Sequence, residues 1–98
     1  MNYVYKYWNT ALIWSCENNN TKLSKLFIEN KANLDLQNEY GYTALMWSCK
    51  NNDIKLSKFL IENKANLDLQ DKYRNTALIL SCENNNNKSI ILLLESCS

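Results

Sequence analysis

Apolar residues recur at helical spacing in short segments of this chain, and asparagine-rich turns separate the segments. In the first segment Leu12, Ser15 and Cys16 fall at i, i+3 and i+4, which is the spacing that lines one face of a helix. Thr10 stands just before them as an N-cap candidate. The asparagines at 18–20 should end this helix, because asparagine tolerates the left-handed backbone found at helix C-termini.

A second helix is predicted directly after those asparagines. Leu23, Leu26 and Phe27 repeat the same spacing, Asn30 extends it, and Ile28 widens the stripe. The side expected to face water consists of Lys22, Ser24, Lys25 and Glu29. We expect this helix to stop near residues 30–31. The alternating apolar and polar residues that follow, as far as residue 42, predict a short extended arm with a turn at residues 40–41.

This unit of helix, turn, helix and arm occurs nearly three times in the sequence. Thr-Ala-Leu starts at Thr10, Thr43 and Thr76, 33 residues apart each time (43 − 10 and 76 − 43). Neither helix can bury its stripe alone, so units with a fixed period of about 20–50 residues stack into arrays. The sequence therefore predicts an all-α, helix–turn–helix solenoid with short extended loops between repeats. Such an architecture presents an extended surface rather than a catalytic pocket.

The repeat resembles the ankyrin repeat. The segment Gly-Tyr-Thr-Ala-Leu-Met-Trp-Ser-Cys at 41–49 is similar to the ankyrin opening Thr-Pro-Leu-His-x-Ala with its preceding turn glycine. The segments 28–35 and 61–68 are similar to the ankyrin segment Leu-Leu-Glu-x-Gly-Ala-Asp-Val-Asn. The resemblance covers residues 10–98. It implies an ankyrin-type stack whose concave face and loop tips bind another protein.

The resemblance also divides the chain. Residues 1–9 correspond to the tail of a preceding loop, since Tyr7 matches Tyr40 and Tyr73. The remaining chain becomes an ankyrin repeat at 10–42, a second at 43–75, and a terminal partial repeat, a helix pair, at 76–98.

Several positions depart from the ankyrin pattern. Alanine replaces the usual proline at positions 11, 44 and 77. The usual histidine is replaced by an apolar residue, namely Ile13, Met46 and Ile79. The glycine of Gly-Ala-Asp is a lysine at 31 and 64, and a lysine in left-handed geometry costs roughly 1–2 kcal/mol. We therefore expect Asn30 and Asn63 to take that geometry instead. The turn glycine is Arg74 in the last arm and Trp8 in the first. These departures predict a modestly stable array.

Cys16, Cys49 and Cys82 share one repeat position. Stacked helices place such positions about 10 Å apart, beyond the roughly 7 Å that a disulfide spans. We expect three free, buried thiols that act as small apolar residues, which suits a reducing compartment. No histidine and no CxxC pair is present, so we expect no metal site.

Composition argues against several functional classes. Lysines and acids are interspersed and the formal net charge is +1, which does not favour nucleic-acid binding. The chain has no histidine and one glycine, so the usual general base and a glycine-rich phosphate loop are missing. We expect no enzyme activity and no cofactor, and a solvated structural role for Asp35 and Asp68. We expect residues 1–8 not to act as a signal peptide, and the apolar run 90–94 to be too short to span a membrane. We expect an intracellular, cytoplasmic location.

The resemblance implies a binding surface at the loop tips and on the first helix of each pair. The loop-tip candidates are Gln37, Glu39, Tyr40, Tyr42, Gln70, Lys72, Tyr73 and Asn75. The first-helix candidates are Trp14, Glu17, Asn18, Trp47, Lys50 and Asn51. Aromatic residues are favoured at binding hot spots, and tyrosine with asparagine is a common recognition mixture.

Structural roles remain open for the same residues. Trp14 and Trp47 could pack against each other, and the regular recurrence of Tyr40 and Tyr73 also suits a loop-stabilising role. We expect contacts specific to one partner at positions where the copies differ. Gly41-Tyr42 in one loop corresponds to Arg74-Asn75 in the next, and Glu17 corresponds to Lys50 and then to Glu83.

The last helix departs from its siblings. Ser57 and Lys58 of the second repeat correspond to Ile90 and Ile91, although a terminal repeat is expected to carry a polar outer face. Exposed apolar patches often mark interfaces. The alternative function is therefore a structural fragment of a longer repeat scaffold, or a module that forms homo-oligomers through the C-terminal helix.

Overall fold

The computed structural model describes residues 11–96, which contain six helices and no strand. The first helix covers residues 11–17. The others are α2 (Thr21–Glu29), α3 (Ala44–Lys50), α4 (Ile54–Glu62), α5 (Ala77–Glu83) and α6 (Asn87–Ser96). The predicted all-α class is confirmed. The N-cap candidate Thr10 and the segment 1–9 lie outside the described residues.

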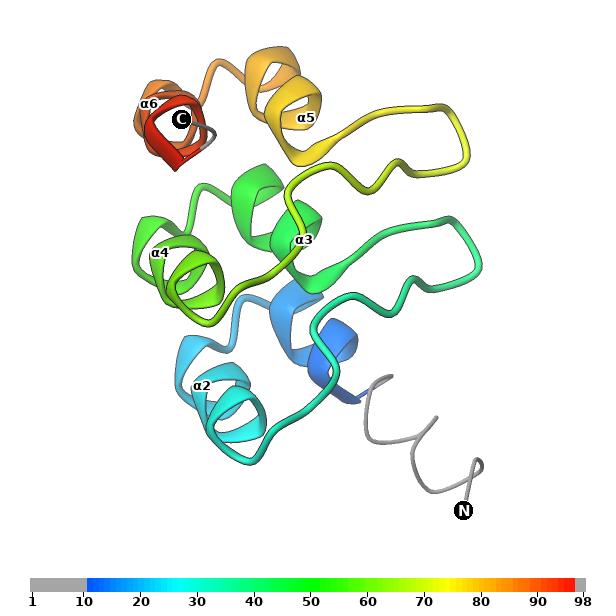
Figure 1. Cartoon of the computed structure of the whole chain (residues 1–98), viewed down its shortest axis with the longest axis vertical. Coiled ribbons are helices and arrows are strands. Elements are labelled where there is room, and N and C mark those ends of the chain that lie inside the picture. Colours follow the sequence, from blue (N-terminus) through cyan, green and yellow to red (C-terminus); the bar gives the residue numbers. More distant parts are fainter. Residues whose placement is uncertain (1–10, 97–98) are drawn as a thin grey trace.

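Three helix pairs stack one above another (Figure 1). The first helices of the pairs, namely 11–17, α3 and α5, form one layer. The second helices, α2, α4 and α6, form the other, and two long loops project from the first-helix side. Helix α3 packs against α4 and α5, and α4 packs against α2 and α6. The middle pair therefore has a neighbour on each side, whereas each outer pair has only one within the described stack.

Local hydrogen bonds begin and end the helices where the sequence predicts. The side chain of Thr43 accepts from the N–H of Met46 at 3.2 Å, and Thr76 accepts from Ile79 at 3.3 Å. The backbone turns into each second helix at a left-handed asparagine. These residues are Asn19, Asn52 and Asn85, with φ of 59°, 58° and 54°. The expectation that asparagine ends the first helices is confirmed.

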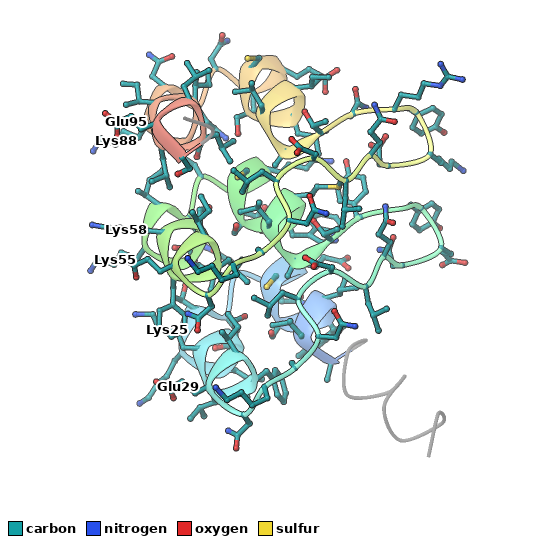
Figure 2. All side chains as sticks on the ribbon, in the orientation of Figure 1. Lys25, Glu29, Lys55, Lys58, Lys88 and Glu95 are labelled. Carbon is teal, nitrogen blue, oxygen red and sulfur yellow. The ribbon has the colours of Figure 1, made fainter. Side chains whose placement is uncertain are left out.

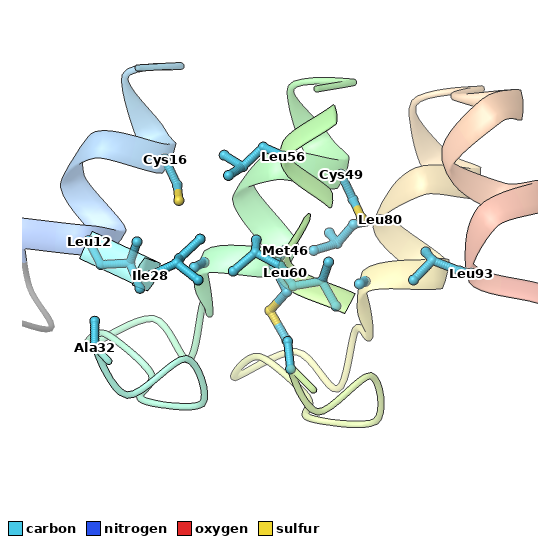
Figure 3. Close-up of a cluster of buried hydrophobic side chains, with 14 residues drawn as sticks. Leu12, Cys16, Ile28, Ala32, Met46, Cys49, Leu56, Leu60, Leu80 and Leu93 are labelled. Carbon is cyan, nitrogen blue, oxygen red and sulfur yellow. The ribbon is translucent and has the colours of Figure 1, made fainter. Parts of the chain in front are cut away.

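The apolar core runs as one continuous row through the stack (Figure 3). Hydroxyl pairs lie within it, since Ser15 and Ser24 share a hydrogen bond of 2.7 Å and Ser48 and Ser57 share one of 2.8 Å. All four serines are buried. The larger buried side chains are Leu12, Leu45, Met46, Leu56, Leu60 and Leu93.

Helix α2 buries a face that only partly matches the predicted one. Ser24 and Ile28 are buried, while Leu26 is exposed and lies on the opposite side of the helix from Ile28. The prediction that Ser24 faces water was wrong, because its hydroxyl pairs with Ser15 inside the core. A helix at the end of a stack buries the side that meets its single neighbour, and the apolar stripe on its other side stays partly exposed.

The left-handed residues at the ends of the second helices also differ from expectation. Lys31 and Lys64 have φ of 69° and 73°, whereas Asn30 and Asn63 have φ of −91° and −93°. The reason is that each asparagine remains bonded to its helix. The side chain of Asn30 donates to the carbonyl of Leu26 at 2.7 Å, so the chain reverses one residue later.

Candidate functional site

Two hairpin-like fingers form the tips of the projecting loops. Finger 1 is residues 38–42 and finger 2 is residues 71–75. The N–H of Asn38 donates to the carbonyl of Tyr42 at 3.0 Å, and the N–H of Asp71 donates to that of Asn75 at 2.9 Å. The turns are centred on residues 39–40 and 72–73. The first turn is thus one residue earlier than predicted, because the N–H of Gly41 closes it by donating to Asn38 at 2.9 Å.

Asn38 and Asp71 organise the fingers, and the sequence analysis missed both. The side chain of Asp71 accepts from the N–H groups of Tyr73 and Asn75 at 2.8 and 2.9 Å, and Asn38 makes the equivalent bonds in finger 1. Burial favours a higher pKa for Asp71, but these donors and the charge of Lys50 lower its pKa overall. The sequence feature that could have identified them is an Asn or Asp two residues before the tyrosine in both copies, because such side chains commonly bond the backbone of a turn.

The two fingers stack directly on each other. The N–H of Lys72 donates to the carbonyl of Tyr40 at 3.0 Å, and the amide of Gln37 donates to the carbonyl of Gln70 at 2.7 Å. Gly41 has a φ of +80°, and a Cβ there would lie 2.8 Å from the Cα of Asp71. Finger 1 therefore requires glycine at this position for close approach as well as for backbone conformation.

Arg74 occupies the glycine position of finger 2 with a φ of 68°. No described residue stacks on the outer side of finger 2 in the way that finger 2 stacks on finger 1 (Figure 1), so a side chain fits there. The difference between Gly41 and Arg74 thus has a packing reason within this stack.

A cluster of Tyr42, Trp47 and Lys50, here the finger-base cluster, lies where finger 1 meets α3. The rings of Tyr42 and Trp47 are 4.8 Å apart between centroids and tilted by 46°. The Nζ of Lys50 is 5.4 Å from the centroid of each ring, within cation–π range. Trp47 therefore packs on Tyr42, while Trp14 on the preceding helix is exposed.

A second cluster of Tyr40, Lys72 and Tyr73, here the finger-tip cluster, lies at the outer end of both fingers. The Nζ of Lys72 is 5.3 Å from the centroid of each tyrosine ring. The side chains of Tyr40 and Tyr73 are 52% and 73% exposed. Finger stacking thus brings residues 33 positions apart in the sequence into one aromatic and cationic surface.

The other candidate residues divide between framework and surface. Gln37, Gln70 and Asn75 contribute hydrogen bonds within or between the fingers, whereas the side chains of Glu17 and Glu39 are exposed. Asp35 also supports the framework, since its carboxylate accepts from the N–H of Asn66 at 2.8 Å.

The candidates on the last helix differ from each other. Ile90 is half-buried and Ile91 is exposed. Ile90 takes the repeat position of Ser57, which is why the serine pair of the middle repeat has no counterpart here. The hydroxyls of Ser81 and Ser89 are buried without a partner in the described part of the chain.

The three related cysteines do not share one environment. Cys16 and Cys49 are buried, but Cys82 is exposed, so the expectation of three buried thiols was wrong for Cys82. No further helix covers α5 on that side within the described stack. Burial raises the pKa of Cys16 to about 11, although the hydrogen bond to Ser24 opposes this rise.

No group of three or more histidine, cysteine, aspartate or glutamate residues within residues 11–96 could hold a metal ion. Within the same range, no helix has the length and apolar character needed to cross a bilayer.

The comparisons with known proteins agree with the repeat geometry. A family model described as ankyrin repeats in three copies matches residues 2–71, well over half of the chain, and α5 and α6 lie beyond the matched range. No curated protein sequence matches the chain. Ankyrin repeats are in general modules for protein–protein interaction and are typically not enzymes. With its stacked helix pairs and fingers, this chain belongs to the ankyrin repeat family.

Proposed function

We propose that the chain binds a partner protein through its fingers and first-helix layer, and that it performs no catalysis. The observation that carries this proposal is the finger-tip cluster. Two tyrosines that are more than half exposed flank Lys72 at the tips of the two fingers. Tyrosine is favoured at hot spots, and loops held by a rigid scaffold commonly carry function.

The fingers support this role because they hold the cluster in place without using its rings. The carboxylate of Asp71 and the amide of Asn38 bond the backbone of each finger. Backbone bonding between Lys72 and Tyr40 fixes the fingers to each other. The backbone that carries the tyrosines is therefore ordered before a partner arrives, which reduces the ordering entropy lost on binding.

The finger-base cluster and Trp14 extend the proposed surface along the first helices. The ammonium group of Lys50 and the hydroxyl of Tyr42 lie 3.5 Å apart, which places a cation and a hydroxyl beside aromatic surface. Such a mixture suits a partner segment that combines carboxylate and apolar side chains.

Affinity capture with structure-matched variants tests the proposal. The tagged chain would be incubated with native lysate, and captured proteins identified by mass spectrometry. A Tyr40→Ala, Tyr73→Ala variant should lose a protein that the wild type captures, because exposed rings can be removed without loss of core. Lys22→Ala, Lys55→Ala on the second-helix layer is the matched control and should keep it. Equal capture by both variants at equal helicity in circular dichroism would contradict the proposal.

A further inference from the structure

The outer side of the second-helix layer carries charges in a fixed order. Each second helix has an exposed lysine at its second residue and an exposed glutamate seven positions later. Because seven residues make almost two turns, both lie on one side of the helix. Figure 2 shows Lys55 and Lys88 pointing away from the first-helix layer. Two parallel rows therefore run along the stack, a lysine row of Lys22, Lys55 and Lys88 and a glutamate row of Glu29, Glu62 and Glu95.

This order of charges does not stabilise the helices. The N-terminal end of a helix carries partial positive charge and favours acidic residues, and the C-terminal end favours basic ones. Helices α2, α4 and α6 have no acidic residue in the first turn and no basic residue in the last. Lys22 and Lys55 also form no ion pair with another residue of the range 11–96. Their charges are therefore available to a partner.

Apolar surface separates the two rows. Leu26 lies between them on α2 and is 50% exposed, and Phe59 and Leu92 take the same repeat position with partly exposed side chains. The two rows are about 10 Å apart along each helix, because each residue rises by about 1.5 Å, and this separation is close to the diameter of an α-helix. We call the two rows together with these three apolar residues the outer face.

The lysine side of the outer face carries the greater charge. Lys25 and Lys58 follow the lysine row by one turn, and the Nζ of Lys25 is 5.4 Å from the ring centroid of Phe59. Stacked helices place equivalent residues about 10 Å apart, and residues seven positions apart in a helix are separated by about 10.5 Å on one side. A helix lying along the stack with a carboxylate at every seventh position would therefore meet the lysine row repeat by repeat.

We infer that the outer face binds an amphipathic helix of a partner protein. That helix carries carboxylates along one flank, apolar residues in the middle and fewer basic residues along the other flank. An apolar helix side that lies on a matching surface is a common mode of recognition, and complementary charges fix its register.

A protein helix fits the outer face better than a broad anionic surface does. A bilayer of acidic lipids or a nucleic acid would also lie against the glutamate row, where like charges repel. The outer face is on the opposite layer from the first helices and fingers (Figure 1). The inference therefore goes beyond the proposed function and does not depend on it.

Fluorescence anisotropy with a defined probe tests the inference. The probe is a labelled synthetic helix with glutamate at every seventh position of one flank, leucine in the middle and lysine on the other flank. The wild type should bind it. Lys22→Glu, Lys55→Glu should weaken binding about tenfold, because ion pairs become like-charge contacts. This variant should fold, since glutamate is favoured in the first turn of a helix.

A matched control and a second probe make the result specific. Lys31→Glu, Lys64→Glu gives the same change of net charge at exposed lysines beyond the ends of α2 and α4, and it should bind the probe as the wild type does. The second probe has lysine in place of every glutamate. It should bind Lys22→Glu, Lys55→Glu more tightly than it binds the wild type.

Three outcomes would overturn the inference. The first is equal binding of both probes by the wild type, and the second is equal weakening in the two variants. The third is binding of phosphatidylserine vesicles or duplex DNA through the same lysines without binding of the first probe.

Discussion

The middle helix pair, α3 and α4, and the last pair, α5 and α6, follow one sequence template but pack differently. The middle pair buries Met46, Cys49 and a bonded serine pair. The last pair exposes Ile79 and Cys82 at the same positions. Burial in this molecule therefore depends on how many neighbours a repeat has, and residue type alone does not determine it. Matched substitutions in the two pairs test this view.

The largest difference is expected for apolar truncation. Met46→Ala should lower the free energy of unfolding by about 2–5 kcal/mol, as large-to-small core changes do. Ile79→Ala should cost about 1 kcal/mol or less, because much of its side chain already meets water. Urea denaturation followed by circular dichroism measures both. Equal losses would show that the two repeats are equivalently packed in solution.

The next difference concerns the glycine position of the fingers. Gly41→Ala should destabilise by roughly 2–4 kcal/mol, because it combines left-handed strain with overpacking against Asp71. Arg74→Gly should instead stabilise by up to about 1 kcal/mol, since it relieves the same strain where no described residue stacks on the outer side of finger 2. Thermal unfolding of the two variants provides the measurement. A neutral Gly41→Ala would disprove the close approach of the fingers.

A pH-dependent difference should follow from the thiols. The pKa of Cys16 rises from 9.0 to about 11 on folding. Between these pH values the unfolded chain has lost a proton that the folded chain keeps, so stability is complete below pH 9 and declines as pH rises towards 11. The loss attributable to Cys16 is on the order of 2 kcal/mol.

Urea midpoints between pH 8 and 10.5 would reveal this decline. Cys16→Ala should reduce the pH dependence, and part of it should remain because burial also raises the pKa of Cys49. An equal slope in the wild type and in Cys16→Ala would contradict the assignment to Cys16.

The smallest effects should have opposite signs at one repeat position. Ser48→Ala removes hydrogen bonds to Ser57 and to the carbonyl of Leu45 and should cost about 0.5–1.5 kcal/mol. Ser81→Ala removes a buried hydroxyl that has no partner among the described residues and should stabilise by about 1 kcal/mol. Differential scanning calorimetry would resolve the two shifts. Destabilisation by Ser81→Ala would show that its hydroxyl has a partner in solution.

Much of the fold could be predicted because its signals are local and repeated. Thr43 and Thr76 cap helices, and the asparagine runs end them, through contacts within a few residues. The face of α2 could not be obtained in this way. Ser24 is buried because it meets Ser15, and a hydrophobic stripe does not show that a serine belongs to the core.

The position of the loop tips was predictable from the sequence, but the arrangement of their side chains was not. The recurrence of Tyr40 and Tyr73 marked the loop tips, yet their grouping around Lys72 depends on one finger stacking on the next. Pairing of Trp47 with Tyr42 likewise needs the loop to fold back over α3. Asn38 and Asp71 were missed because their role is to bond a turn whose exact position the pattern did not define.

The sequence by itself determined the repeat period, the all-α class, the helix ends and the family, because these depend on spacing and on short-range hydrogen bonds. The tertiary structure alone decided which copies of a residue are buried. Cys49 and Cys82 occupy one repeat position and meet different surroundings. The physical reason is that stacking supplies neighbours from outside the repeat, and an end repeat has one neighbour fewer.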